Sequence, residues 1–224
     1  LAHGLWMSGY ACLYWRQAVR EAGLNPILFS YPTAWNHMDQ NADRLFKAVK
    51  RHSTSTDRVN FVGHSMGGMV ILHMLRRHGA QFGQNGLPQL GRVVVCGSPI
   101  NGSHVAQTII RQWPVLGHAL GRSIIDWPGI SRDELPQSLE LGVLAGTRNL
   151  GLGRVIKTLP QPSDGTVSLS ETELQGGETD RIRMNMGHAE MLVAPAASRQ
   201  IVHFLQKGRF LHRTDAAFQS SVAH

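Results

Sequence analysis

The stretch FVGHSMGGMV, residues 61–70, decides how this sequence is interpreted. Two apolar residues lead into Gly63, and a second apolar run resumes after Gly68. The pattern predicts a strand that turns sharply into a helix, with Ser65 at the corner. A serine there takes an uncommon backbone conformation, and side chains two residues before and after it would collide. Gly63 and Gly67 remove those side chains, so we predict a nucleophile on a strained corner rather than a flexible turn.

Strand-like and helix-like segments alternate on both sides of this corner. Strand character is found at 1–2, 25–32, 58–63, 92–99, 141–149 and 180–188. Helical spacing of apolar residues is found at 10–23, 38–52, 66–79 and 194–208. Strands separated by helices indicate βαβ units and a mostly parallel sheet with helices on both faces. We therefore expect a single α/β domain over residues 1–224.

One segment, 104–136, breaks this alternation. It contains two Trp-Pro pairs, at 113–114 and 127–128, between short apolar patches. Proline-punctuated short helices outside the main sheet would have this composition. We predict a small helical cap here; one ordinary crossover helix with a long loop is the alternative.

Composition sets the broad class of the protein. The chain has 224 residues, 42% of them hydrophobic, which suits one well-buried domain. The net charge of +7 comes from scattered Lys and Arg, which favours solubility. At most it suggests weak contact with an anionic membrane surface. A nucleic-acid binder would need a basic stripe or a recognised module, and the sequence has neither. The composition leaves the oligomeric state open.

Two further features bear on compartment. Cys12 and Cys96 are expected to be buried thiols, with a single disulfide as the alternative. No stretch approaches the roughly 18–20 apolar residues of a membrane span, so we expect a soluble protein and favour the cytoplasm. The chain starts at LAHG, without an initiator methionine or a signal-like segment. The strand that should lead into His3 has only two residues, which suggests that upstream residues are missing.

A serine hydroxyl is a poor nucleophile and needs a base, which in turn needs an orienting carboxylate. Where such a serine stands on a strand-to-helix corner, the order along the chain is nucleophile, acid, histidine. His188 comes directly after the last predicted strand and before the last helix, where the base is required. Four competing histidines are placed less well. His203 and His212 lie within or beyond that helix, and His104 and His118 come too early in the chain.

Asp164 is the predicted acid. It lies in the turn-rich loop PQPSDGTVS, after the predicted strand at 141–149. An ordinary Asp-Gly turn is the alternative interpretation. The competing carboxylates are placed less well. Asp126 and Asp133 fall in the predicted cap, and Asp180 is at the wrong end of its strand. Glu171 and Glu173 look like solvated positions.

Acyl transfer also requires N–H donors for the oxygen of a tetrahedral intermediate. The amide of Met66, directly after the nucleophile, is one candidate. The loop HGLW, after the first strand, should supply the other. Gly4 allows a close backbone approach, so Leu5 is the first choice of donor and Trp6 the second. His3 is expected to brace this loop rather than act as a base.

Five motifs occur in the order expected of the α/β-hydrolase superfamily. They are HGLW, GHSMGG, CGSPINGS, SDGTVS and GHAEML. The chain resembles most closely the bacterial lipase and carboxylesterase branch, and the resemblance extends from His3 to about Gln206. The segment GSPINGS is similar to the GTPHxGS stretch of lipase-like members but departs from it at Ile100 and Asn101.

The resemblance implies hydrolysis of a small-molecule or lipid ester without a metal or organic cofactor. Ser65 would attack the acyl carbon, while His188, oriented by Asp164, would take its proton and later activate water. Trp6 and Met7, with Trp113 of the predicted cap, would line an apolar acyl pocket, although each is more typical of a core position taken singly.

Three alternatives remain open at this point. The same triad would serve a thioesterase, an amidase or an acyltransferase, because the acyl-enzyme is common to all of them. A hydrolase-like domain used only for binding is another class, because fold alone does not imply activity. Such domains usually lack a triad member, and this sequence has candidates for all three. Acyl-chain length and natural substrate are not encoded in the motifs.

Overall fold

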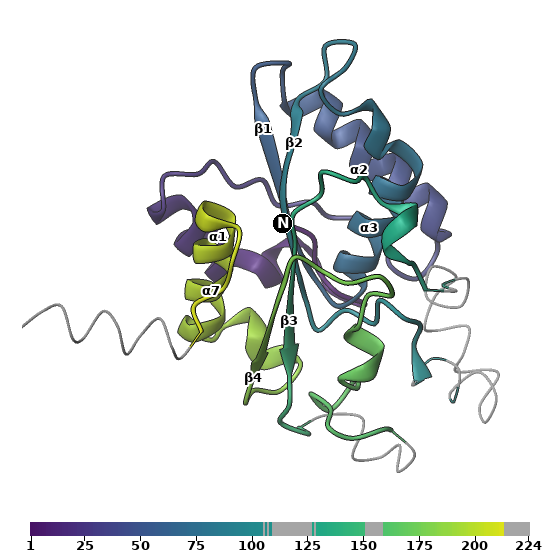
Figure 1. The fold of residues 1–224 in the computed structure, drawn as a ribbon, viewed down its shortest axis with the longest axis vertical. Helices are drawn as coiled ribbons and strands as arrows, with labels where there is room; N and C mark the ends of the chain where they lie inside the picture. Colours follow the sequence, from purple (N-terminus) through teal and green to yellow (C-terminus); the bar gives the residue numbers. More distant parts are fainter. Residues whose placement is uncertain (105, 107, 109–126, 128, 151–158, 213–224) are drawn as a thin grey trace, which may run out of the picture.

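The computed structural model describes residues 1–104, 106, 108, 127, 129–150 and 159–212. Its centre is a parallel sheet whose strands follow one another in chain order (Figure 1). The strands are β1 (Arg58–His64), β2 (Gln89–Cys96), β3 (Leu141–Gly146) and β4 (Asp180–Met184). Parallel neighbours need crossover connections, which the intervening helices and loops provide.

Helices cover both faces of this sheet. In Figure 1, α1 (Leu13–Glu21) and α7 (Pro195–Lys207) lie on one side of the strands. On the other side lie α2 (Met38–His52) and α3 (Met66–His78). Short 3-10 turns, η1, η2, η3, η5 and η6, occur at Gly9–Cys12, Gly79–Gln81, Arg132–Glu134, Ser170–Thr172 and Ala189–Leu192.

The two faces have separate apolar cores because successive residues of a strand point to opposite sides. In β2, Val93 and Val95 pack with the α2 and α3 side, whereas Val94 and Cys96 pack with the α1 and α7 side. All four are fully buried. A strand buried on both faces must be apolar throughout, which is why RVVVC could be recognised as one.

The α/β class, the mostly parallel sheet and the long helices predicted from the sequence are confirmed. The predicted strand at 25–32 is wrong as an extended element, since within the described chain only Phe29 forms a bridge there, to Ala2. Ala2 also forms an isolated bridge to Gly63 of β1, so this single residue connects the segment at Phe29 to the sheet.

Cys12 and Cys96 are free buried thiols, as predicted. Among the described residues, no helix is both long enough and apolar enough to span a bilayer. Most of the predicted cap at 104–136, including Trp113, lies outside the described residues.

Candidate active site

The corner at Ser65 has the predicted strained geometry. Ser65 has φ 53° and ψ −123° and stands between β1 and α3. A Cβ placed on Gly63 would lie 2.5 Å from the amide nitrogen of Gly68, and one on Gly67 would lie 2.3 Å from the carbonyl oxygen of Ala2. Both positions therefore require glycine. The corner presents Ser65 at the amino end of α3, where the helix dipole favours negative charge.

Asp164 and His188 form a hydrogen-bonded pair at the carboxyl ends of the strands. His188 Nδ1 lies 2.7 Å from Asp164 Oδ2, and the aspartate is only 1% exposed. Oδ1 of Asp164 accepts hydrogen bonds from the amides of Thr166 (2.9 Å) and Val167 (2.7 Å). These amides hold the carboxylate in place with its other oxygen toward the ring. With Nδ1–H donating to Asp164, Nε2 of His188 is the nitrogen available as a base.

Gly97, directly after β2, makes room for this pair. Its φ is +56°, and a Cβ there would lie 2.9 Å from Asp164 Oδ2 and 3.1 Å from His188 Nδ1. Any side chain at this position would push the two catalytic candidates apart. The sequence analysis did not single out Gly97. Its signal is the one that marks Gly63: a glycine that ends a buried strand at the edge where the candidate residues gather.

His64, the residue before Ser65, connects the corner to His188. It is fully buried, and its Nε2–H donates to the carbonyl oxygen of His188 over 2.9 Å. The two rings lie 4.7 Å apart, centroid to centroid. Burial, and secondarily the neighbouring His188, lower the pKa of His64 to about 3, so its ring is neutral. This residue was also missed, because its role depends on a contact across 124 residues.

The first loop lies against the nucleophile. A Cβ placed on Gly4 would lie 3.0 Å from His64 Nδ1 and 3.3 Å from the Cβ of Ser65. The Trp6 amide, the second-choice oxyanion donor, donates to Thr33 Oγ1 over 3.2 Å, which makes it a weaker candidate. Within the described part of the chain, the Leu5 amide donates to no other group.

His3 has the bracing role predicted for it. The residue is fully buried, and its ring stacks on Tyr31 at 4.5 Å between centroids. Nδ1–H donates to the carbonyl oxygen of Gly4 (2.9 Å), and Tyr31 Oη–H donates to the His3 carbonyl oxygen (2.6 Å). Burial lowers the pKa of His3, which is consistent with a neutral structural ring.

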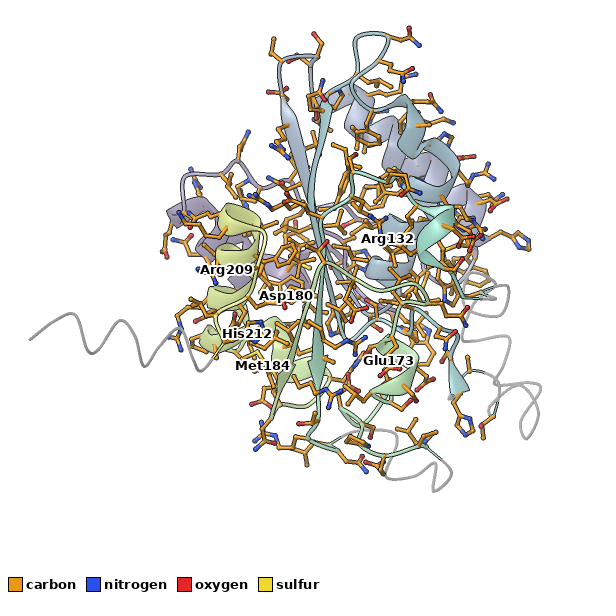
Figure 2. All side chains as sticks on the ribbon, viewed as in Figure 1. Arg132, Glu173, Asp180, Met184, Arg209 and His212 are labelled. Atoms are coloured by element: carbon orange, nitrogen blue, oxygen red, sulfur yellow. The ribbon has the colours of Figure 1, made fainter. Side chains whose placement is uncertain are left out.

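The competing residues lie elsewhere or have structural partners. His212 pairs with Asp180 at 3.0 Å, which Figure 2 shows beside α7 and β4. Nδ1–H of His203 donates a hydrogen bond to the carbonyl oxygen of Arg209 over 2.7 Å. Glu173 is exposed, as expected, but the solvated position predicted for Glu171 is wrong.

Glu171 is buried, and its carboxylate binds the loop that follows Asp164. Its Oε2 accepts hydrogen bonds from both the amide and the hydroxyl of Ser168, each at 2.6 Å. This use of both donors of one serine offsets the cost of burying the carboxylate.

Two of the three predicted acyl-pocket residues, Trp6 and Met7, lie within the described part of the chain. Trp6 is 60% exposed, whereas Met7 packs against the buried core on the α1 and α7 side. Trp113 lies outside the described residues.

Buried histidines predict a loss of stability in acid. Burial lowers the pKa of His3, His64 and His73 in the folded chain, whereas the pKa of a histidine in the unfolded chain is about 6.5. Below that pH the unfolded chain binds more protons, so the free energy of unfolding falls until the folded pKa is reached, about 3 for His64. We expect a lower urea midpoint at about pH 4.5 than at about pH 7.5. His64→Gln should reduce this difference, and an undiminished difference would contradict the role of His64.

Comparisons with known proteins agree with this fold. A family model described as "Alpha/beta hydrolase of unknown function (DUF915)" matches residues 36–114. No curated protein matches the sequence. Among solved structures, the mature lipase BlEst2 of Bacillus licheniformis is similar, with a TM-score of 0.65 and 18% identity over 92% of this chain and 89% of that one.

Two further solved structures are similar to this chain, with somewhat lower TM-scores. The metagenomic carboxyl esterase MGS0156 has a TM-score of 0.58 and 18% identity over 84% of this chain and 63% of that one. The RedJ thioesterase of Streptomyces coelicolor has a TM-score of 0.58 and 16% identity over 91% and 82%, respectively. The parallel sheet, the corner at Ser65 and these likenesses give the chain the fold of the α/β-hydrolase superfamily.

Proposed function

We propose that the protein is a serine hydrolase that cleaves carboxylic esters through an acyl-enzyme, with Ser65, His188 and Asp164 as its catalytic triad. The observation that carries this proposal is the Asp164–His188 pair, 2.7 Å between Oδ2 and Nδ1, which His64 connects to the strained corner at Ser65. Chemistry of this kind needs an oriented imidazole close to a serine hydroxyl. Asp164 orients the ring of His188, and His64, the neighbour of Ser65, contacts His188, which supports the proposal.

The reaction follows from the roles that these groups can take. Ser65 Oγ attacks the acyl carbon while Nε2 of His188 accepts its proton, and Asp164 stabilises the imidazolium that forms. The amides of Leu5 and Met66 hold the oxyanion. His188 then protonates the leaving alcohol, and in the second half of the cycle it activates the water that releases the acid.

Thioester hydrolysis is the second candidate, and the RedJ thioesterase among the similar structures favours it over amide hydrolysis or acyl transfer. The triad alone does not discriminate, since each reaction passes through the same acyl-enzyme. A panel of p-nitrophenyl esters from acetyl to palmitoyl, with matched acyl thioesters and anilides, would rank the activities. Turnover of thioesters or anilides with none of any ester would overturn the ester assignment.

The nucleophile is tested independently of substrate choice. A fluorophosphonate probe reacts only with activated serines, so we expect stoichiometric labelling at Ser65, located by peptide mass spectrometry. Labelling should be lost after heat denaturation and retained in Ser53→Ala, a control serine in the loop after α2. Labelling of another serine, or of none, would contradict the proposal.

His64 is expected to position the base rather than to react. Its Nε2–H holds the backbone carbonyl of His188, and displacing a catalytic group by about 1 Å can cost roughly 100-fold in rate. We expect His64→Leu to lower kcat by about 10- to 100-fold with little change in KM. His64→Gln, whose amide can donate to the same carbonyl, should recover most of the rate. Equal losses in both variants at equal thermal stability would contradict the positioning role.

A further inference from the structure

The peptide between Met186 and Gly187, directly before the proposed base, is held at both ends. Its carbonyl oxygen accepts a hydrogen bond from the amide of Arg148 over 3.2 Å. Its N–H donates to Oε2 of Glu190 over 2.9 Å. In a trans peptide the C=O and the N–H point in opposite directions, so this pair of contacts resists rotation of the peptide plane.

Arg148 closes these contacts into a ring. Its guanidinium binds the same Oε2 of Glu190 that accepts from the Gly187 amide. One residue therefore reaches both ends of the peptide, one end through its backbone and the other through Glu190. The hydrogen bond from Arg148 also lowers the pKa of Glu190, which keeps the carboxylate ionised at neutral pH. An ionised acceptor forms the stronger hydrogen bond with the amide.

The two peptides that follow are held as well. The amide of His188 donates to the carbonyl oxygen of Asp164 over 2.9 Å. The carbonyl oxygen of His188 accepts from Nε2–H of His64, also over 2.9 Å. Two of the three successive peptides around the base are thus fixed by other parts of the site. The first begins at the most permissive residue, Gly187, where external contacts matter most for the direction of the chain.

Exposure separates the effect of this pair on rate from its effect on stability. The side chains of Arg148 and Glu190 are 40% and 39% exposed. Ion pairs so open to solvent contribute little to the free energy of unfolding. Displacing a catalytic group by about 1 Å, in contrast, can lower the rate roughly 100-fold. The pair should therefore matter more for the position of the base than for the stability of the fold.

We propose that Glu190 and Arg148 are positioning residues for His188. Together they fix the Met186–Gly187 peptide, and with it the direction in which the imidazole leaves the turn. Both act through the backbone of the turn rather than on the substrate. The inference rests on the proposed function, in which His188 is the base.

Glu190→Ala tests the role directly, because it removes the acceptor of the Gly187 amide. With a short-chain p-nitrophenyl ester we expect kcat to fall about tenfold while KM changes less than about twofold. The thermal midpoint should move by no more than about 2 °C. Hydrogen exchange at the Gly187 amide, followed by NMR, should become at least about tenfold faster.

Two conservative variants separate the hydrogen bond from the ion pair. Glu190→Gln keeps a side-chain oxygen for the Gly187 amide, so kcat should recover to within about threefold of the unmodified chain. Arg148→Met keeps the backbone amide that binds Met186 but loses the guanidinium. Its kcat should lie between those of Glu190→Gln and Glu190→Ala.

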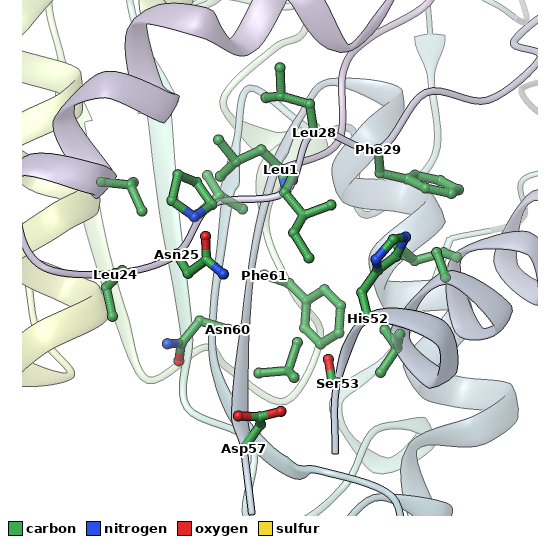
Figure 3. Close-up of a pocket in the computed structure, with 18 of the residues that line it drawn as sticks. Leu1, Leu24, Asn25, Leu28, Phe29, His52, Ser53, Asp57, Asn60 and Phe61 are labelled. Atoms are coloured by element: carbon green, nitrogen blue, oxygen red, sulfur yellow. The ribbon is translucent and has the colours of Figure 1, made fainter.

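Asp57→Ala is the matched control. Oδ2 of Asp57 accepts the amide of Thr54 over 2.7 Å, so it too is an exposed carboxylate that holds an amide three residues earlier. Figure 3 shows Asp57 among the residues that line a cavity of about 740 Å³, and no triad residue lines this cavity. The variant should keep kcat within about twofold of the unmodified chain.

Three results would overturn the proposal. The first is a kcat for Glu190→Ala within about twofold of the unmodified chain. The second is a loss in Glu190→Gln as large as that in Glu190→Ala. The third is an equal loss in Asp57→Ala, which would make the effect a general one of turn stability. Inactivity of the unmodified chain on every acyl substrate contradicts the proposed function, whereas unchanged exchange at Gly187 in Glu190→Ala contradicts this inference, so the two failures are distinguishable.

Discussion

Ser65→Ala is expected to reduce ester hydrolysis by about 10⁴- to 10⁶-fold, because the substitution removes the attacking oxygen and leaves no route to an acyl-enzyme. Activity above the uncatalysed rate should persist only to the extent that the Leu5 and Met66 amides bind the transition state. Initial rates with a short-chain p-nitrophenyl ester measure the loss, and a burst experiment shows whether an acyl-enzyme still accumulates.

The control for this variant is Ser53→Ala, which should retain the full rate. Circular dichroism should show that both variants are folded, because the close packing at the corner depends on the neighbouring glycines and not on the Ser65 hydroxyl. A Ser65→Ala protein that kept more than about a hundredth of the rate would exclude Ser65 as the nucleophile.

Asp164→Asn is expected to lower kcat by about 10⁴-fold while leaving the fold intact. An asparagine can still accept the hydrogen bonds from Thr166 and Val167 through its oxygen. Its NH₂ group would then face His188 Nδ1 and force the ring proton onto Nε2. A base that already carries its proton cannot take the proton of Ser65. The loss should therefore appear in kcat across the pH range rather than as weaker binding.

Glu173→Gln provides the matched control for this change, because it removes one exposed carboxylate from the same loop region. It should retain activity close to that of the unmodified chain. Near-normal rates in Asp164→Asn would require a different acid, with Asp126 and Glu171 as the next residues to test.

The sequence was a good guide where structure depends on local patterns. The predicted helix at 38–52 and α2 have the same limits, because its apolar face and polar flanks are both local. The prediction of a strand at 25–32 was wrong, because a strand needs a hydrogen-bonded neighbour. Within the described chain only Leu1 and Ala2 pair with this segment. Burial of Glu171 could not be predicted for a similar reason, since its partners come from the folded loop.

The candidate site shows the same division. Chain order and position after strands sufficed to nominate Asp164 and His188, which the fold brings into contact. Gly97 and His64 were missed because their roles lie in approaches between segments far apart in the chain. A residue that holds a backbone carbonyl has no chemical signature in a single sequence, and Gly97 is marked only by its position directly after a buried strand.

The Asp164 and His188 loops are joined through their backbones as well as their side chains. The amide of His188 donates to the carbonyl oxygen of Asp164 over 2.9 Å, and the amide of Asp164 donates to that of Val167 over 3.0 Å. The position of one loop is therefore coupled to that of the other through the main chain. A change in length or backbone conformation in either loop would shift its partner even where every side chain is kept.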